Sequence, residues 1–100
     1  MQNISVEEVK SRLDAGEKIN LVDVREPDEH AAFNIGGILL PLGKVQGMQL
    51  ESIEALKEKE VIVYCRSGKR SLQAGLFLEA NGFGNVKNLE GGMLAWQENS

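Results

Sequence analysis

The first third of the chain alternates between a helical and an extended pattern of apolar residues. Ser5 and Glu8 form a capping-box pattern, and apolar residues then recur at helical spacing up to Leu13. Gly16 is expected to end this helix. The run over 19–24 (Ile-Asn-Leu-Val-Asp-Val) predicts a strand. A helix next to a strand is the building unit of α/β proteins.

Proline and glycine divide the middle of the chain into shorter pieces. Pro27 suits the first position of a helix, and Asp28 and Glu29 favour the positive end of a helix dipole. Gly36-Gly37 interrupts the chain. The pattern predicts a helix over 27–33, a strand over 38–40, a loop over 43–47 and a helix over 49–59.

The last third contains a strand that is apolar on both faces. The run Val61-Ile62-Val63-Tyr64 begins with three β-branched residues and has no polar face, as is typical of strands in parallel sheets that are covered on both sides. The pattern then predicts a helix over 72–80, a strand over 85–89 and a final helix after Gly91-Gly92, anchored by Trp96. Strands and helices alternate without a linker or repeat. We therefore expect one α/β domain over residues 1–100 with a mainly parallel sheet.

Composition narrows the class of protein. The chain has 100 residues, of which 42% are hydrophobic and 26% are charged, as in an ordinary globular domain. It has no apolar run of the ~20 residues that cross a bilayer. It also shows no charged-then-apolar leader after Met1. We expect a cytoplasmic protein that does not engage a membrane.

Charge and cysteine usage exclude further classes. The net charge of −4 gives no overall electrostatic case for nucleic acid. Cys65 is the only cysteine and His30 the only histidine, so an intrachain disulfide and a cysteine-cluster metal site are excluded. We expect no metal and no cofactor, and a chemistry that runs on one thiol. His30 is expected on the surface.

Basic residues gather around that thiol. Arg66, Lys69 and Arg70 follow Cys65 closely with no acid among them, while the rest of the chain has a net charge of −7. The segment 65–71 (Cys-Arg-Ser-Gly-Lys-Arg-Ser), called the thiol loop below, comes directly after a predicted strand. Ligands of open α/β sheets bind at this edge, where the strands end. The thiol loop is therefore the candidate site.

The thiol loop has the parts of an anion cradle. A strand–loop–helix junction aims backbone amides at one point, and the helix dipole adds about half a positive charge there. Gly68 permits a tight turn, and Ser67 and Ser71 add hydroxyl donors. Such surroundings depress the pKa of a thiol. Cys65 is thus predicted to be reactive without a histidine in the loop.

Such a cradle suits a phosphate, an arsenate or a sulfur species attached to Cys65. Cysteine-dependent phosphatases place an arginine after five intervening residues. Here Arg70 follows after four, and Ser71 occupies the position of that arginine. A shorter ring of amides leaves a smaller hole, which favours a sulfur atom over a tetrahedral phosphate.

Two charged residues lie at the end of the strand over 19–24. Asp23 and Arg25 belong to the same sheet edge as the thiol loop. They either position the substrate or the loop, or form an ion pair that holds the strand end, and the pattern favours the ion pair.

Taken together, these segments resemble the rhodanese (sulfurtransferase) family in its single-domain form. The resemblance covers nearly the whole chain and rests on Leu21–Glu26, on Val63–Ser71, and on Gly82-Phe83 with Asn88–Gly92 and Ala95-Trp96. One segment departs from the family pattern. Over 33–38, Asn34 and Gly36 stand where many members have histidine and proline.

The resemblance implies a rhodanese-like three-layer fold, with a mainly parallel five-stranded sheet between helices. It also implies that Cys65 is catalytic and takes the outer sulfur of a donor such as thiosulfate, forming a persulfide. A thiol, a protein or, in the test tube, cyanide would then accept the sulfur. The substrate-binding residues that it implies are Arg66, Ser67, Gly68, Lys69, Arg70 and Ser71.

Two other functions stay open. The domain could be a non-catalytic or sulfur-carrying interaction module that serves a dedicated partner. It could also be a phosphatase or arsenate reductase of the same fold. The intact Cys65 and its cationic loop argue against a dead domain, and the spacing to Arg70 argues against a phosphatase.

Overall fold

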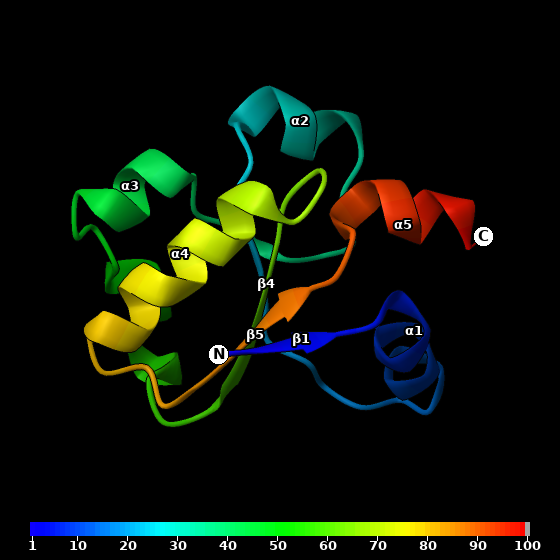
Figure 1. Ribbon diagram of the computed structural model, residues 1–100, viewed down its shortest axis with the longest axis horizontal. Coiled ribbons are helices and arrows are strands. Elements are labelled where there is room, and N and C mark those ends of the chain that lie inside the picture. Colours follow the sequence, from blue (N-terminus) through cyan, green and yellow to red (C-terminus); the bar gives the residue numbers. More distant parts are fainter. Residues whose placement is uncertain (100) are drawn as a thin grey trace.

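The computed structural model describes residues 1–99 and builds them around one sheet (Figure 1). Its strands are β1 (Gln2–Ile4), β2 (Leu21–Asp23), β3 (Ile38–Leu39), β4 (Glu60–Tyr64) and β5 (Asn85–Leu89). The strand order is β1-β5-β4-β2-β3, and every neighbouring pair is parallel. The expected α/β fold with five strands is confirmed.

Helices lie on both faces of this sheet. They are α1 (Val6–Asp14), α2 (Pro27–Ala32), α3 (Leu42–Gln46), the 3₁₀ helix η1 (Glu51–Leu56), α4 (Lys69–Ala80) and α5 (Gly92–Glu98). The core residues of α1 and α5 belong to one apolar cluster, and those of α3, η1 and α4 to the other. Figure 1 shows α2 above the carboxyl ends of the strands, beside the segment that joins β4 to α4. None of the helices in residues 1–99 has both the length and the apolar character needed to cross a membrane.

The central strand β4 explains why the sheet is covered on both sides. Its last four residues, Val61 to Tyr64, are fully buried. Val61 and Val63 pack into the cluster of α3, η1 and α4, whereas Ile62 and Tyr64 pack into the cluster of α1 and α5. Successive side chains of a strand point to opposite faces, so an unbroken apolar run needs a cover on each. This packing fixes the end of β4, where Cys65 follows.

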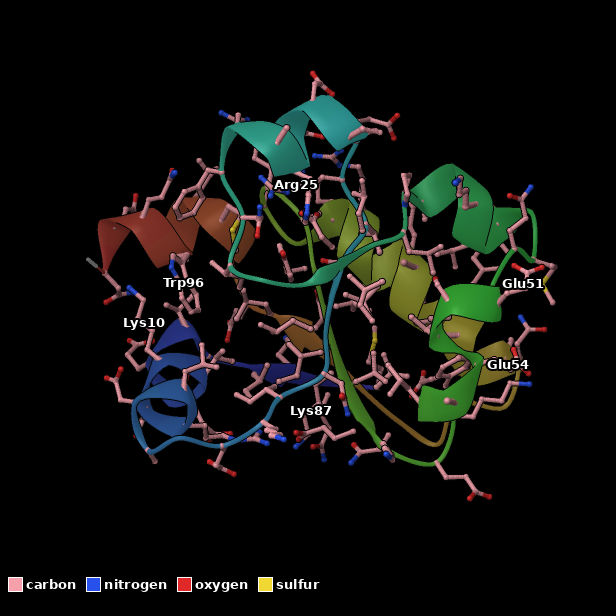
Figure 2. All side chains as sticks on the ribbon, turned by 180° about the vertical axis from the view of Figure 1, so that it is seen from behind. Lys10, Arg25, Glu51, Glu54, Lys87 and Trp96 are labelled. Carbon is pink, nitrogen blue, oxygen red and sulfur yellow. The ribbon has the colours of Figure 1, made fainter. Side chains whose placement is uncertain are left out.

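Trp96 anchors α5, as the sequence predicts. Its ring packs against the apolar cluster that α1 and α5 share. Lys10 of α1 lies beside it (Figure 2), with Nζ 4.8 Å from the ring centroid and 3.0 Å from the Trp96 carbonyl oxygen, to which it donates. A cation over an indole ring and a shared apolar cluster hold α5 against α1.

The sequence pattern missed β1 and overextended β2. Strand β1 has only three residues, of which Ile4 alone is buried, so it shows no alternation to detect. It is recognised only by its pairing with β5, in which Asn3 lies opposite Asn88. The predicted strand over 19–24 shortens to Leu21–Asp23, because only these residues pair along their neighbours.

Between β3 and β4, two predictions name the wrong kind of secondary structure. The segment 43–47, expected to be a loop because of its glycines, is mostly the helix α3, which buries Val45. The helix expected over 49–59 is instead the short 3₁₀ helix η1. Leu50 and Ile53 are both buried, and a spacing of three residues fits the three-residue turn of a 3₁₀ helix as well as an α-helix.

Helix α4 begins three residues earlier than the sequence pattern predicts. Gly68 precedes it with φ of 101°, a left-handed conformation that favours glycine, and Lys69 is its first residue. The predicted start at Leu72 followed the apolar residues and missed the polar first turn. The thiol loop therefore ends inside a helix, whose first amides have no partner within the helix.

The segment that departs from the family pattern forms a local turn. Asn34 accepts a hydrogen bond from the Gly36 amide at 2.8 Å and donates to the His30 carbonyl oxygen at 2.9 Å. Gly36 has φ of 92°. Proline is fixed near φ of −65°, so this turn excludes the proline that many family members have at that position.

The N-terminus of α5 packs against the first residues of the thiol loop. The Met93 amide donates to the Cys65 carbonyl oxygen at 2.9 Å, and the Leu94 amide donates to the Arg66 carbonyl oxygen at 3.0 Å. Gly92 has φ of 57°, and a Cβ atom there would lie 2.6 Å from the Arg66 carbonyl oxygen and closer still to that of Cys65. Only glycine allows the two backbones to approach this closely.

The helical state of Gly43 gives a first prediction. This residue is exposed within α3, and a Cβ atom added to it meets nothing within 4 Å. Gly43→Ala should raise the free energy of unfolding by about 0.5–1 kcal/mol, because alanine loses less backbone entropy in a helix. Urea denaturation measures this change. A loss of stability would show that 43 does not lie in a helix.

The contact at Gly92 gives a second prediction, with Gly82 as its control. Gly82 also has a positive φ, 95°, but an added Cβ atom meets nothing within 4 Å. Gly82→Ala should therefore cost about 1 kcal/mol of stability from backbone strain alone. Gly92→Ala should cost about 2–4 kcal/mol, because it adds a clash with two carbonyl groups. Equal losses in urea denaturation would contradict the close approach.

Candidate active site

Cys65 lies at the end of β4, where the sheet presents its carboxyl edge. The residue is 1% exposed, although it begins a loop. Strand pairing places Asp23 of β2 and Asn88 of β5 beside the last residues of β4, next to Tyr64 and Val63 respectively. The single thiol therefore sits between two neighbouring strand ends and under the start of α4.

Hydrogen-bond donors of the thiol loop surround the sulfur atom. The Gly68 amide lies 3.1 Å from Cys65 Sγ, and the Ser71 amide lies 3.4 Å from it. The Ser71 hydroxyl oxygen is 3.3 Å away. The loop thus curls around Sγ, and the first turn of α4 closes the curl. This arrangement supports a negative charge on sulfur.

Burial and hydrogen bonding act in opposite directions on the Cys65 thiol. Burial raises its pKa, because an anion is costly away from water. The Ser71 hydroxyl, when its proton faces the sulfur, and the amides of Ser71, Gly68 and Ser67 lower it by more. The pKa of Cys65 therefore lies below its ordinary value, and the fraction of thiolate at neutral pH is raised.

The thiol loop brings its three cations into different surroundings. Arg66 and Lys69 are exposed, and within residues 1–99 neither takes part in a salt bridge. Arg70 instead donates from both terminal nitrogens to the Glu29 carboxylate, at 2.7 and 2.9 Å. Ser67 is exposed on the loop. The two cations left to attract an anionic ligand are thus Arg66 and Lys69.

The Arg70–Glu29 pair ties α4 to α2. Its two parallel hydrogen bonds have the fork geometry of arginine with a carboxylate. The guanidinium of Arg70 lowers the pKa of Glu29 to about 2, so the carboxylate stays ionised at ordinary pH. The pair positions the N-terminus of α4 rather than presenting its charge to a ligand.

Asn88 is a site residue whose role sequence analysis missed. Its Nδ2 donates to the Gly68 carbonyl oxygen at 3.1 Å, and its Oδ1 lies 2.5 Å from the Ser71 hydroxyl oxygen. Asn88 is 6% exposed. A buried asparagine must find hydrogen-bond partners. The signal available in the sequence was an asparagine near the end of the predicted strand over 85–89.

A buried charge cluster lies at the end of β2, of which sequence analysis predicted only the ion pair between Asp23 and Arg25. Arg25 donates to both oxygens of the Asp23 carboxylate, at 2.9 and 2.8 Å, and to the Phe33 carbonyl oxygen at 2.6 Å. Figure 2 shows Arg25 directly below α2. The ion pair favoured by the sequence is therefore present, and it joins the strand end to the segment after α2.

His30 belongs to the same cluster, which corrects the expectation that it is a surface residue. Its side chain is 24% exposed, and Nδ1 lies 2.8 Å from Oδ2 of Asp23. Burial raises the pKa of Asp23, but hydrogen bonds from Arg25 and His30 lower it by more, so the pKa lies below its ordinary value. The place of His30 on a short helix could not reveal this contact in the sequence, because its partner, Asp23, lies on the strand β2.

Within residues 1–99, no three side chains of histidine, cysteine, aspartate or glutamate come together as a metal site requires. The arrangement is instead that of a nucleophilic sulfur with amide donors. It can hold a charge, or a transferred atom, on one sulfur at the edge of the sheet.

Comparison with known proteins places this geometry in a family. The protein family described as "Rhodanese-like domain" matches residues 5–99 of this chain. A sulfurtransferase of Allochromatium vinosum is 39% identical over 97 residues, covering 96% of this chain and 88% of that protein. The similarity therefore extends over both proteins almost from end to end.

Solved structures agree. A rhodanese-like domain protein from Staphylococcus aureus is 34% identical with a TM-score of 0.85, covering 96% of this chain and 91% of that one. A human single-domain sulfurtransferase is 28% identical with a TM-score of 0.82, covering 100% and 98%. Because the family's domain matches residues 5–99, the chain belongs to the rhodanese-like family, whose members here include sulfurtransferases.

Proposed function

We propose that this protein is a sulfurtransferase that carries a sulfane sulfur on Cys65, with thiosulfate or a similar anion as donor. The observation that carries the proposal is the buried Cys65 sulfur, surrounded by the donors of Gly68 and Ser71. A nucleophilic sulfur that must also act as a leaving group needs this kind of anion stabilisation.

The reaction proceeds in two displacements at sulfur. The Cys65 thiolate attacks the outer sulfur of thiosulfate, forming a Cys65 S–S bond while the donor S–S bond breaks and sulfite leaves with the electron pair. A thiophilic acceptor then attacks the outer sulfur of the Cys65 persulfide. The persulfide bond breaks, and Cys65 returns as a thiolate that the loop amides stabilise.

The acceptor lies outside the chain. Cys65 is the only cysteine in the sequence, so no second thiol can resolve the persulfide internally. A low-molecular-weight thiol, a protein thiol or cyanide can take the sulfur. The cytoplasmic location and the single domain over 1–100 stay predictions.

The phosphatase alternative loses its support at Arg70. A phosphatase needs a free arginine to hold the equatorial oxygens of the phosphoryl group, and Arg70 is engaged by Glu29. With Arg70 engaged, the anion-binding groups around Cys65 are the loop amides and the two exposed cations. These suit a donor that presents its outer sulfur to Cys65.

A third prediction concerns the persulfide. After incubation with thiosulfate, the intact mass of the protein should rise by one sulfur, roughly 32 Da. A later addition of a thiol should remove that mass and restore the starting protein. Mass spectrometry under non-reducing conditions measures both half-reactions.

Cys65→Ser is the matched control, because it keeps the side-chain shape while removing the nucleophilic sulfur. It should show no gain of mass while keeping the native circular dichroism spectrum. A mass gain that persists in Cys65→Ser would overturn the role of Cys65. If the native protein gains no mass from thiosulfate but hydrolyses an aryl phosphate through Cys65, the phosphatase alternative returns.

A fourth prediction concerns the two free cations. If Arg66 and Lys69 attract an anionic donor, Arg66→Gln/Lys69→Gln should lower the second-order rate constant for thiosulfate about 3–10-fold at low ionic strength. The difference from the native protein should close as salt is added, because salt screens the attraction. Stopped-flow loss of free thiol measures the rate.

Lys18→Gln/Lys59→Gln is the control for net charge. Both lysines are exposed and precede β2 and β4, at the sheet edge opposite the thiol loop. This variant removes the same charge but should change the rate less than twofold. An equal drop in both double variants would assign the effect to the net charge of the protein instead of the loop.

A further inference from the structure

The Ser71 hydroxyl faces two acceptors with one proton. Its oxygen lies 3.3 Å from Cys65 Sγ and 2.5 Å from Asn88 Oδ1. A serine hydroxyl donates one hydrogen bond at a time. The proton therefore serves either the sulfur or the amide oxygen of Asn88, and the surrounding contacts decide which.

The Gly68 carbonyl fixes the orientation of the Asn88 side chain. The atom of Asn88 that faces this carbonyl oxygen, at 3.1 Å, must be the NH₂ group, because two carbonyl oxygens repel. Oδ1 consequently points at Ser71. The side chain cannot be turned over without losing the Gly68 contact.

The short contact between Ser71 and Asn88 places the proton. Two oxygen atoms 2.5 Å apart need a proton between them, and Asn88 Oδ1 has none to give. All three residues are buried, with exposures of 1% for Cys65, 0% for Ser71 and 6% for Asn88, so the enclosed group has little access to water for a replacement donor. The hydroxyl therefore points away from the sulfur.

We propose that Asn88 is a positioning residue: it takes the Ser71 hydroxyl proton and keeps it from Cys65, so that backbone amides alone stabilise the sulfur anion. Asn88 acts through Ser71 and touches no reacting atom. Its second bond, to the Gly68 carbonyl, holds the amide that faces the sulfur. One side chain thus sets which donors the sulfur receives.

This arrangement favours the first of the two displacements, a consequence that rests on the proposed function. Each donor to a thiolate makes it a better leaving group but a weaker nucleophile. An additional O–H bond to the sulfur would stabilise the anion further. By withholding it, Asn88 leaves Cys65 more nucleophilic toward a sulfur donor than the full set of nearby donors would allow.

The test is a double-mutant cycle on the thiol, with no sulfur donor present. The variants are Ser71→Ala, Asn88→Leu and both together; leucine nearly matches the shape of asparagine but has no polar atoms. Because the chain has one cysteine, the ultraviolet absorbance of the thiolate against pH reports the pKa of Cys65 alone. The charged groups at this edge stay the same in every variant: Asp23, Arg25, Glu29, His30, Arg66, Lys69, Arg70 and Glu90.

The proposal predicts how the pKa of Cys65 changes in each of the three variants. Ser71→Ala alone should leave the thiol pKa within about 0.3 pH units, because the lost proton did not serve the sulfur. Asn88→Leu should lower the pKa by about 0.5–1 pH unit, because the freed hydroxyl turns to the sulfur. In the double variant this decrease should vanish.

Two outcomes would overturn the proposal. A rise of about 0.5 pH units or more in Ser71→Ala alone would mean that the hydroxyl already serves the sulfur. An equal decrease from Asn88→Leu with and without Ser71 would mean that Asn88 acts by moving the loop. If Asn88→Leu fails to fold, the small substitution Ser71→Ala still decides. The titration is independent of persulfide formation, so it stands or fails apart from the proposed function.

Discussion

The site depends on hydrogen-bond donors that can stabilise a negative charge on a sulfur atom shielded from water. Cys65 is almost completely buried, and a buried charge is costly unless hydrogen-bond donors replace its hydration. The donors come from a loop that must end in the first turn of α4, where amides have no partner of their own. The parallel sheet, the left-handed Gly68 and the early start of α4 can all be understood as the means of bringing those amides to one point.

The inward direction of the amides follows from where the carbonyl groups of the loop are held. The amides at the start of α5 bind the carbonyl oxygens of Cys65 and Arg66, and Asn88 binds that of Gly68. Carbonyl groups anchored on the outside leave the N–H groups of a tight loop facing its centre. The glycine at 92 and the asparagine at 88 therefore act on the sulfur without touching a ligand, by fixing the backbone that does.

Sequence patterns predicted the parts of this site that are local and missed those that form through space. Cys65 at a strand end, a cationic loop and a covered parallel sheet follow from a run of apolar residues and the segment after it. Strand β1 was too short to show a pattern. Gly43 within α3 and Gly47 directly after it made this helix resemble a loop. The pairing of Arg70 with Glu29 joins residues 41 positions apart, so the sequence counted three free cations where the fold leaves two.

The buried acid beside the site explains why those pairings matter for the thiol. Asp23 lies on the strand next to β4, opposite Tyr64, one residue before Cys65. An unpaired carboxylate there would oppose a second negative charge on the sulfur. Arg25 and His30 bind that carboxylate, and the Arg25 guanidinium also reaches the backbone after α2. The contacts that fasten α2 over the sheet edge thus also compensate the charge of the buried Asp23 carboxylate. The electrostatic field at Cys65 is therefore set by the loop amides, the start of α4 and the two free cations.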